Sequence, residues 1–340
     1  MKIKPRIDLK NRTELQCVIP LTTPFIINVD PCDMCNFQCK FCPTGNRKLM
    51  NKTSGRNHGF MNFGLYKNII DDLAEFDKPI KVLRLYKDGE PLLNSSFLDM
   101  VRYAKASPCV DRIDTTTNAS LLNKEYNLKL IDAGLDRINI SIEGTSGKQY
   151  LDFSKCKLNF SRLVSNIEHL YQNKHDELEM IIKINGDLLT EEEKGFFLGV
   201  FGPIADGVFV EKVMSCWPTF DIGYDVDPDT GIYGQKTKEV MVCPYVFYSF
   251  SINSDGSASI CFLDWNRSLL IGDLNKMSVK QVWQSEALLK YQFMFLEKKR
   301  KEHHFCGNCG QMTHGMPDDI DEYAEMLLEK IGDTNESIRT

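Results

Sequence analysis

Three cysteines close together in the sequence carry the clearest chemical potential. Cys35, Cys39 and Cys42 follow the spacing C-x3-C-x2-C, with Phe41 immediately before the last of them. Three thiolates on one short loop can ligate three corners of a cubic iron–sulfur cluster, which leaves the fourth iron open. An open coordination position distinguishes a reactive metal site from a closed structural one. Structural zinc is the alternative, because Cys32 adds a fourth nearby thiol.

A second set of four cysteines lies further along the chain. Cys243 and Cys261 flank the sequence Asn-Ser-Asp-Gly at residues 253–256, which is typical of a β-hairpin turn. Cys306 and Cys309 follow as a C-x2-C pair. Four thiolates can fill a closed zinc site or ligate an auxiliary iron–sulfur cluster, and chemistry alone leaves both open.

The elements that must position these cysteines form a repeating pattern between residues 25 and 213. Segments rich in Val and Ile predict buried parallel strands at residues 25–29, 80–86, 112–117, 137–142, 178–184 and 207–213. Helical spacing of apolar residues predicts helices at residues 63–76, 96–106, 124–133, 160–173 and 191–200. Six β–α units predict an α/β fold with a parallel sheet, although periodicity does not choose between a partial barrel and a doubly wound sheet.

Ligands of parallel α/β folds bind at the carboxyl ends of the strands, and the first cysteine loop follows the first strand at that edge. Further candidate binding residues follow the next three strands: Gly89, Glu90, Pro91, Asn118, Ser141 and Glu143. Each run, taken alone, is also typical of an ordinary strand-to-helix turn. Their order and their common edge favour one shared site.

Together these residues resemble the radical S-adenosylmethionine (radical SAM) superfamily, whose signature is C-x3-C-x-aromatic-C. The resemblance implies a (βα)6 partial barrel. It implies that Cys35, Cys39 and Cys42 ligate a [4Fe–4S] cluster whose open iron binds SAM, and that Phe41 packs near the adenine. Cys32 lies outside the signature, and we expect it to be a buried thiol.

The resemblance also implies how SAM is held at the strand ends. The Gly-Glu-Pro run at residues 89–91 would hold the amino group of SAM. Asn118 would lie beneath SAM, and Ser141 and Glu143 would lie around its ribose and carboxylate. Apolar contact with the adenine is expected near Ile184.

The second cysteine set is similar to the SPASM/twitch extension of this superfamily, which opens with C-x9–15-G-x4-C. Four ligands fit the twitch form, with one auxiliary [4Fe–4S] cluster, and the layout is similar to that of 2-deoxy-scyllo-inosamine dehydrogenase. The implied domains are a core at residues 22–213, a linker or substrate-facing loop at 214–242, an auxiliary-cluster domain at 243–310 and a helical tail at 311–340. Trp217, Tyr224 and Tyr233 lie in the loop that is expected to face the substrate.

Composition limits the classes of partner. The 340 residues carry a net charge of −6, which predicts no general attraction to nucleic acid or to an anionic membrane. An apolar span of about 20 residues and a signal-peptide core are both lacking, so we expect a cytoplasmic protein. The 12 cysteines would then stay reduced. The remaining ones are expected to act as small buried apolar residues: Cys17, Cys109, Cys156 and Cys216.

Four expectations concern the C-terminal third. One helix should begin at the N-cap Ser278 and run to about residue 300. The basic run at residues 298–301 is interpreted as a helix C-terminus whose charge complements the helix dipole, rather than as a nucleic-acid site. The two histidines at 303–304 are interpreted as a solvated helix end, with a role near Cys306 as the alternative. Residues 318–331 should form an acidic surface helix.

The resemblance implies an oxidoreductase. A reductant such as flavodoxin or ferredoxin would supply one electron, SAM would be cleaved to a 5′-deoxyadenosyl radical, and that radical would take hydrogen from the substrate. The auxiliary cluster would accept an electron, giving a two-electron oxidation of a sugar, amino sugar or cyclitol. A peptide-modifying enzyme is one alternative, although only about 24 residues precede the first strand, and a zinc-stabilised binding protein is another. No residue is assigned as proton acceptor.

Overall fold

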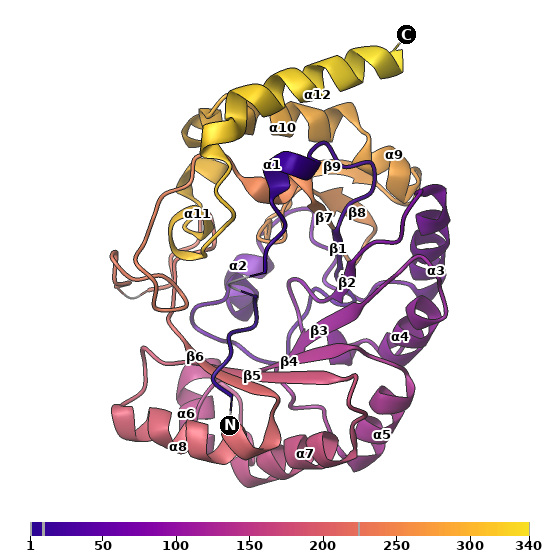
Figure 1. The fold of residues 1–340 in the computed structure, drawn as a ribbon. Coiled ribbons are helices and arrows are strands. Elements are labelled where there is room, and N and C mark those ends of the chain that lie inside the picture. Colours follow the sequence, from indigo (N-terminus) through magenta and orange to yellow (C-terminus); the bar gives the residue numbers. More distant parts are fainter. Residues whose placement is uncertain (1, 9–10, 224, 340) are drawn as a thin grey trace.

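The computed structural model describes residues 2–8, 11–223 and 225–339, with side chains to residue 333. Six parallel strands lie in chain order in one curved sheet (Figure 1): β1 (Ile26–Val29), β2 (Val82–Leu85), β3 (Ile113–Thr117), β4 (Arg137–Ile142), β5 (Glu179–Asn185) and β6 (Gly207–Glu211). All six predicted strands are present, with ends shifted by three residues or fewer. The predicted α/β fold with a radical SAM-type partial barrel is confirmed.

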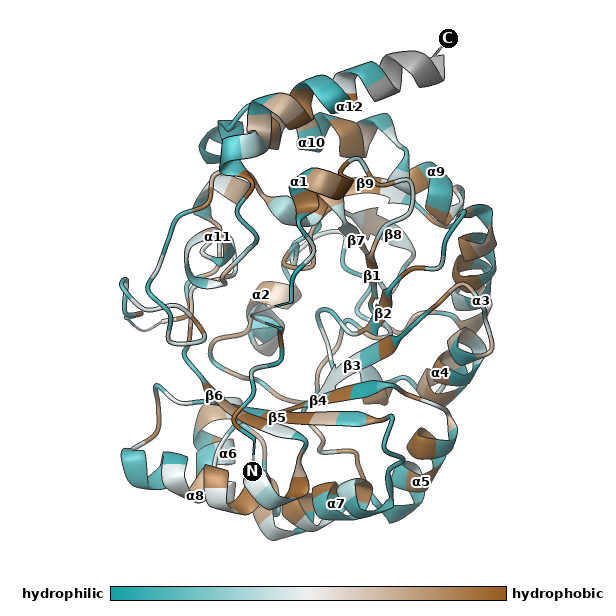
Figure 2. Ribbon diagram, viewed as in Figure 1, coloured by the Kyte–Doolittle hydropathy of each residue, from teal (hydrophilic) through white to brown (hydrophobic). Residues whose placement is uncertain are grey.

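Helices cover the outer face of this sheet (Figure 1): α3 (Phe63–Asp72), α4 (Phe97–Lys105), α5 (Lys124–Asp132), α7 (Phe160–Asn173) and α8 (Glu191–Phe201). Hydrophobic residues gather on the strands and on the helix faces turned toward them (Figure 2). Local sequence fixes where these helices begin. Asn62, Asn123 and Asn159 each accept a backbone N–H as N-cap, and Thr190 forms a capping box with Glu193.

Three short helices were not predicted. They are α1 (Leu15–Val18), α2 (Arg47–Met50) and α6 (Gly147–Ser154). The eight residues of α6 bury only Tyr150 and Ser154, so its apolar periodicity is too weak to recognise in the sequence. Its N-cap Ser146, which accepts from the backbone N–H of Gln149, was the available signal.

The C-terminal third extends the barrel sheet. The hairpin predicted around residues 253–256 is present, as β7 (Ser249–Ile252) paired antiparallel with β8 (Ser257–Ser259), and β9 (Leu270–Asp273) follows. In addition, β7 pairs parallel with β1, with Ile26 opposite Ser249. In the described residues, one sheet therefore runs β6-β5-β4-β3-β2-β1-β7-β8-β9. The predicted domain boundaries stay predictions.

The single helix predicted from Ser278 to about residue 300 is wrong. The chain forms α9 (Val279–Trp283) and then α10 (Glu286–Leu296), because Ser285 caps a new helix through the N–H of Leu288. Ser278 does cap α9, in a capping box with Gln281. A short helix, α11 (Gln311–His314), follows α10.

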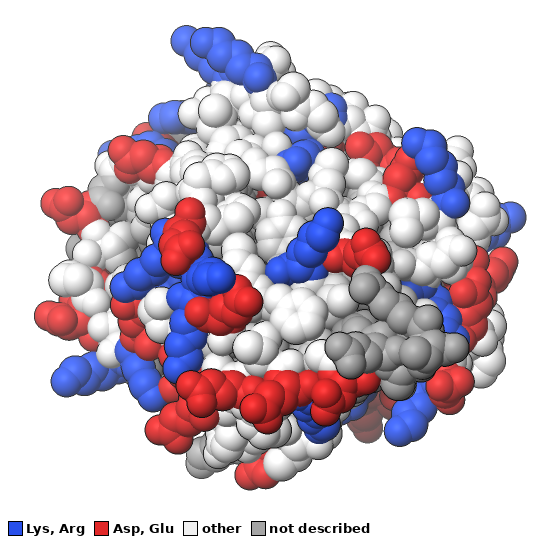
Figure 3. Space-filling view, turned by 90° about the horizontal axis from the view of Figure 1, so that it is seen from above, with Lys and Arg blue, Asp and Glu red and all other residues white. Residues whose placement is uncertain are grey.

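The acidic helix predicted at residues 318–331 is shifted toward the C-terminus. A turn at Asp321–Tyr323 leads into α12 (Ala324–Arg339), which packs on α10. Leu327 and Ile331 are buried in that contact, so the helix is amphipathic rather than purely superficial. Figure 3 looks down on this end of the molecule and shows a row of acidic side chains on it; Glu322, Glu325 and Glu329 are exposed.

The N-terminal segment crosses the open side of the barrel, from β6 toward α12 (Figure 1). Ile3 forms a parallel bridge to Val208 of β6, and Arg6 pairs with Glu211 at 2.9 Å. Further along, Arg12 pairs with Asp318 at 3.1 Å. This segment therefore closes the side that the six strands leave open. In the part of the chain that is described, no helix is long and apolar enough to cross a membrane.

A buried group of charges joins the barrel to the C-terminal third. Arg267 donates to Asp88 at 2.7 Å and lies 3.8 Å from Asp33. Lys87 also donates to Asp88, at 2.9 Å, and Arg56 lies 3.6 Å from the same carboxylate. All five side chains are 0–2% exposed. Cations on both sides hold the pKa of Asp88 well below its usual range, although burial opposes this.

Removing one member of this group should be costly. The substitution Arg267→Met should lower the free energy of unfolding by about 3–5 kcal/mol, because it removes one of the cations that neutralise two buried carboxylates, Asp33 and Asp88. As a matched control, Arg102→Met removes an arginine that is 41% exposed and pairs with Asp99, and should change stability by less than about 1 kcal/mol. Urea unfolding followed by circular dichroism measures both. Equal effects would mean that the buried group does not join the two parts.

Candidate cofactor sites

A cavity of about 570 Å³ occupies the inside of the barrel. The three cysteines of the first loop line it: Cys35, Cys39 and Cys42. So do most of the predicted strand-end residues: Phe41, Gly89, Glu90, Asn118, Ser141 and Glu143. The structure thus brings these residues to one wall of one cavity. Pro91 is the exception, because it begins a buried turn at Pro91–Leu93 outside the lining.

Gly89 packs against the cysteine loop itself. A Cβ at this position would lie 2.2 Å from the carbonyl oxygens of Cys32 and Met34, and the next N–H, of Glu90, donates to Met34 at 2.8 Å. A side chain at this position would therefore clash with the cysteine loop, so glycine lets the loop after β2 support the loop that carries the thiols.

Glu90 joins the loops after β2 and β3. Its carboxylate accepts from the Thr117 hydroxyl at 2.6 Å, the Asn118 N–H at 2.7 Å and the Leu92 N–H at 3.1 Å. Burial raises the pKa of Glu90 to about 7, although these three donors favour the charged form. The Asn118 side chain in turn donates to Asn36, beside Cys35. Glu90 therefore fixes the wall behind the thiols and also presents its carboxylate to the cavity.

Glu143 lies beside the same thiols from the end of β4. The Cys39 thiol hydrogen-bonds its carboxylate, and burial raises the pKa of Glu143. The backbone N–H of Glu143 donates to the Tyr150 hydroxyl at 3.3 Å, so the unpredicted helix α6 positions this loop.

The four remaining candidate ligands surround a second, smaller cavity of about 30 Å³: Cys243, Cys261, Cys306 and Cys309. Its other walls include Ile260, Phe295 and Phe305, so the site is apolar. Tyr245 lines both cavities, and the carbonyl of Cys216, which lines the large one, lies 3.9 Å from the Cys309 thiol. The two sites are therefore neighbours.

The donor set fits iron–sulfur clusters at both sites. Thiolate is the ligand such clusters take from proteins, and all seven candidate ligands line these two cavities, three in the large one and four in the small one. Burial raises the pKa of each of the seven thiols, so ligation must displace their protons. In the described residues, no three His, Cys, Asp or Glu side chains are grouped as ligands of a single metal ion.

Arg300 is a neighbour of the second site that the sequence analysis misplaced. It was interpreted as one of the charges that complement the dipole at a helix C-terminus, yet it is buried and lines the small cavity. It donates to the carbonyls of Met241 at 3.2 Å and Cys306 at 3.0 Å, and it pairs with Glu239. Its charge lowers the pKa of Cys306, against the larger effect of burial.

Other residues differ from their expected places. His303 accepts the N–H of Cys306 at 3.3 Å, which supports the alternative of a role beside the second site. Cys17 is exposed and Cys216 lines the large cavity, whereas Cys32 is buried as predicted. Of the loop aromatics, Trp217 and Tyr233 line the large cavity. Tyr224 lies outside the described residues.

Comparison with known families identifies the class of protein. Residues 29–193 match the model of the Radical SAM superfamily, and residues 243–310 match the SPASM iron–sulfur cluster-binding domain. The chain therefore carries the domain pair of a radical SAM enzyme with a SPASM domain. The first domain implies a SAM-bound [4Fe–4S] cluster, and the second implies auxiliary iron–sulfur clusters. The resemblance seen in the sequence is confirmed.

Individual relatives are more distant. GTP 3′,8-cyclase of Vibrio atlanticus (strain LGP32) is 24% identical over 174 residues, or 51% of this chain and 49% of that protein. The chain spans about half the length of the first curated relatives it matches. BtrN, solved with AdoMet and 2-DOIA, has TM-score 0.54 and 18% identity over 84% of this chain and 92% of its own. SuiB of Streptococcus suis, solved with precursor peptide SuiA, has TM-score 0.58 and 12% identity over 82% of this chain and 68% of its own. These likenesses support the fold.

The tight contact at Gly89 predicts a selective effect of one methyl group. Gly89→Ala should lower stability by at least about 1–3 kcal/mol, because the new Cβ overlaps two backbone oxygens that cannot easily move. Gly199→Ala is the matched control, since nothing lies within 4 Å of its Cβ position in α8, and it should raise stability by up to about 1 kcal/mol. Thermal unfolding compares them. A neutral Gly89→Ala would show that the two loops are not in contact.

The buried Arg300 gives a second prediction. Arg300→Met leaves the carbonyl of Met241 without its arginine donor, at a cost of about 1–3 kcal/mol, and leaves the carbonyl of Cys306 with only the N–H of Cys309, so it should loosen the four-cysteine site. The reconstituted variant should then release iron from that site to a chelator faster than the parent protein. Lys299→Met, which removes a side chain that is 51% exposed, should release iron at the parent rate. Identical rates for both variants would contradict the role given to Arg300.

Proposed function

We propose that this protein is a radical SAM oxidoreductase that carries out a two-electron oxidation of a small polar substrate. One observation carries the proposal: the three half-buried cysteines of the first loop line one large cavity, and a second set of four lies next to it, across Tyr245 and Cys216. Three ligands leave an iron open to SAM, whereas four ligands leave none open, so the second cluster is suited to electron transfer. A substrate in the cavity is then near both sites.

When loaded, the first site would supply the 5′-deoxyadenosyl radical, formed by one-electron cleavage of SAM, and this radical takes a hydrogen atom from the substrate. The chain's own residues contribute position and shielding. Glu90 and Asn118 hold the loop behind the thiols, while Glu143 and Ser141 present polar groups to the cavity. The N-terminal segment covers the open side, which limits the access of water to a reactive carbon radical.

The substrate we favour is a sugar, amino sugar or cyclitol that is oxidised by one electron pair. Hydrogen-atom loss, then loss of one electron to the auxiliary cluster and one proton to a base, would balance the oxidation of an alcohol to a carbonyl. The likeness to BtrN with bound 2-DOIA supports this choice. We expect the reductant to be a flavodoxin or ferredoxin, and the protein to be located in the cytoplasm. We assign the cluster ligands to the cysteines of the two sets, and the SAM contacts to the strand-end residues that line the large cavity.

Peptide modification is the second candidate, and the likeness to SuiB with its bound precursor peptide favours it. A peptide needs an entrance, whereas here the N-terminal segment and residues 315–318 line the cavity at its open side. A cavity that is partly covered in this way fits a small molecule better than a peptide. A zinc-stabilised binding protein without catalysis is the third candidate. Metal analysis that finds zinc in place of iron would favour it.

Two cysteine variants test the proposal. With dithionite and SAM, Cys35→Ala should form no 5′-deoxyadenosine, because the first cluster loses a ligand. Cys306→Ala should still form 5′-deoxyadenosine but give no oxidised product. Cys109→Ala, a half-buried thiol outside both cavities, is the control and should behave like the parent protein. Formation of 5′-deoxyadenosine by Cys35→Ala, or full product formation by Cys306→Ala, would refute the assigned roles.

A further inference from the structure

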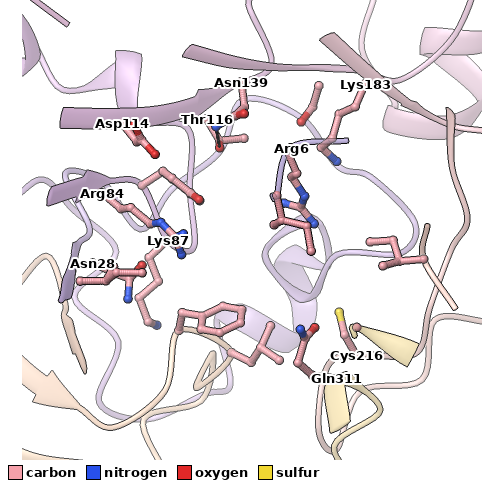
Figure 4. Close-up of a pocket in the computed structure, with 18 of the residues that line it drawn as sticks. Arg6, Asn28, Arg84, Lys87, Asp114, Thr116, Asn139, Lys183, Cys216 and Gln311 are labelled. Atoms are coloured by element: carbon pink, nitrogen blue, oxygen red, sulfur yellow. Dashed lines mark hydrogen bonds between the residues drawn. The ribbon is translucent and has the colours of Figure 1, made fainter. Parts of the chain in front are cut away.

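The inner face of the barrel is polar, and its residues come from alternate positions of the strands. Leu83, Leu85 and Ile140 point outward and are buried under the helices. The residues between them line the cavity, among them Asn28 of β1, Arg84 of β2, Asp114 and Thr116 of β3, Asn139 of β4 and Lys183 of β5 (Figure 4). The charges of a polar wall in a partly enclosed cavity need partners.

Most cations of this wall are already paired. Arg6 and Lys183 both bind Glu211, at 2.9 and 3.0 Å. Lys87 binds Asp88 at 2.9 Å. Two further arginines of the lining are also occupied: Arg12 binds Asp318 at 3.1 Å, and Arg137 donates to the carbonyl of Arg6 at 2.6 Å.

Arg84 lines the cavity, and its buried Nε atom, like those of Arg6 and Arg137, has no hydrogen-bond partner among the described residues. Arg6 and Arg137 have other partners, whereas no carboxylate among the described residues forms an ion pair with Arg84. Asp114, the carboxylate that acts on Arg84 electrostatically, accepts from Arg112 at 2.9 Å. Figure 4 shows Arg84 reaching into the cavity from β2, with Arg6 and Lys183 on the far side.

The surroundings of Arg84 suit a ligand with oxygen atoms. Asn139, on the same inner face, has a buried side-chain oxygen without a donor. Tyr245 and Tyr248, from the segment that carries Cys243, are among the titratable groups that act on Arg84, together with Asp114 and Tyr86. Arg84 also precedes Gly89 by five residues, so it lies deeper in the barrel than the strand-end residues assigned to SAM.

We propose that Arg84 binds the substrate, and that the substrate carries an anionic group, a carboxylate or a phosphate. The planar guanidinium donates two parallel hydrogen bonds to either group, and a partly enclosed cavity strengthens such a pair relative to water. Asn139 would accept from a hydroxyl of the same molecule. This inference rests on the proposed function, because it assumes that the cavity holds a substrate as well as SAM, and it narrows the substrate class to acidic sugars or cyclitols.

The test is carried out on the reconstituted full-length protein with SAM present. Calorimetry compares three probes: glucose, glucuronate and glucose 6-phosphate. The parent protein should bind at least one of the two acids tenfold or more tightly than glucose, and which acid it prefers distinguishes carboxylate from phosphate. Arg84→Met should abolish that preference, and Arg84→Lys should keep part of it, since a point charge remains. If neither acid is preferred, or if Arg84→Met keeps the preference, the inference is overturned.

A second readout separates failure of the inference from failure of the proposed function. Formation of 5′-deoxyadenosine without substrate reports the fold, the first cluster and SAM binding. Arg84→Met should retain the parent rate there, as should Arg102→Met, a surface control. A parent protein that binds the acids through Arg84 but never cleaves SAM would overturn the proposed function alone. A different outcome would contradict the substrate role. If Arg84→Met no longer cleaves SAM, while Arg84→Lys matches the parent protein in both acid binding and SAM cleavage, Arg84 would be assigned to SAM.

Discussion

The structure depends on the parallel pairing of β1 with β7. This pairing places the C-terminal third on the same sheet as the barrel, although about 220 residues separate the two strands in sequence. Asn28 reinforces the junction by donating to the carbonyl of Phe250. Since the first cysteine loop leaves β1, and Cys243 and Cys261 flank the hairpin of β7 and β8, this pairing sets the positions of the first thiol set and of two members of the second. The buried charges around Asp88 add a second connection at the same junction.

The loops around the first site support one another before any cofactor enters. Gly89 lies against the carbonyls of the cysteine loop, and Glu90 holds the loop that carries Asn118. The Asn118 side chain donates to the side chain of Asn36, which is next to Cys35 in the cysteine loop. Because the chain is already ordered around the place where the ligand sits, it loses less conformational entropy when the ligand binds. This order also means that several residues expected to touch SAM have structural partners as well.

Much of this could be predicted from sequence, for identifiable reasons. The six barrel strands bury the apolar residues of their outer face under the helices, and most of them are recognisable in the sequence from their Val and Ile content. The thiol ligands follow from spacing, because cysteine is rare and its pattern is specific. The pairing of β7 with β1 could not be predicted, since parallel neighbours leave no local signal. Arg300 was misread because a basic run beside a helix end normally faces solvent. Arg84 could not be recognised as a cavity residue, because the sequence of a strand shows that its side chains alternate between two faces but not which face encloses a cavity.

The central claim is that one chain holds two separate iron–sulfur clusters beside a common cavity. The most direct test is iron and acid-labile sulfide analysis after anaerobic reconstitution, on the parent protein and on a variant with Cys35, Cys39 and Cys42 all changed to alanine. Two four-iron clusters predict about eight irons per parent chain and about four in the variant. Zinc in place of iron at either site, or the same iron content in both proteins, would contradict the account.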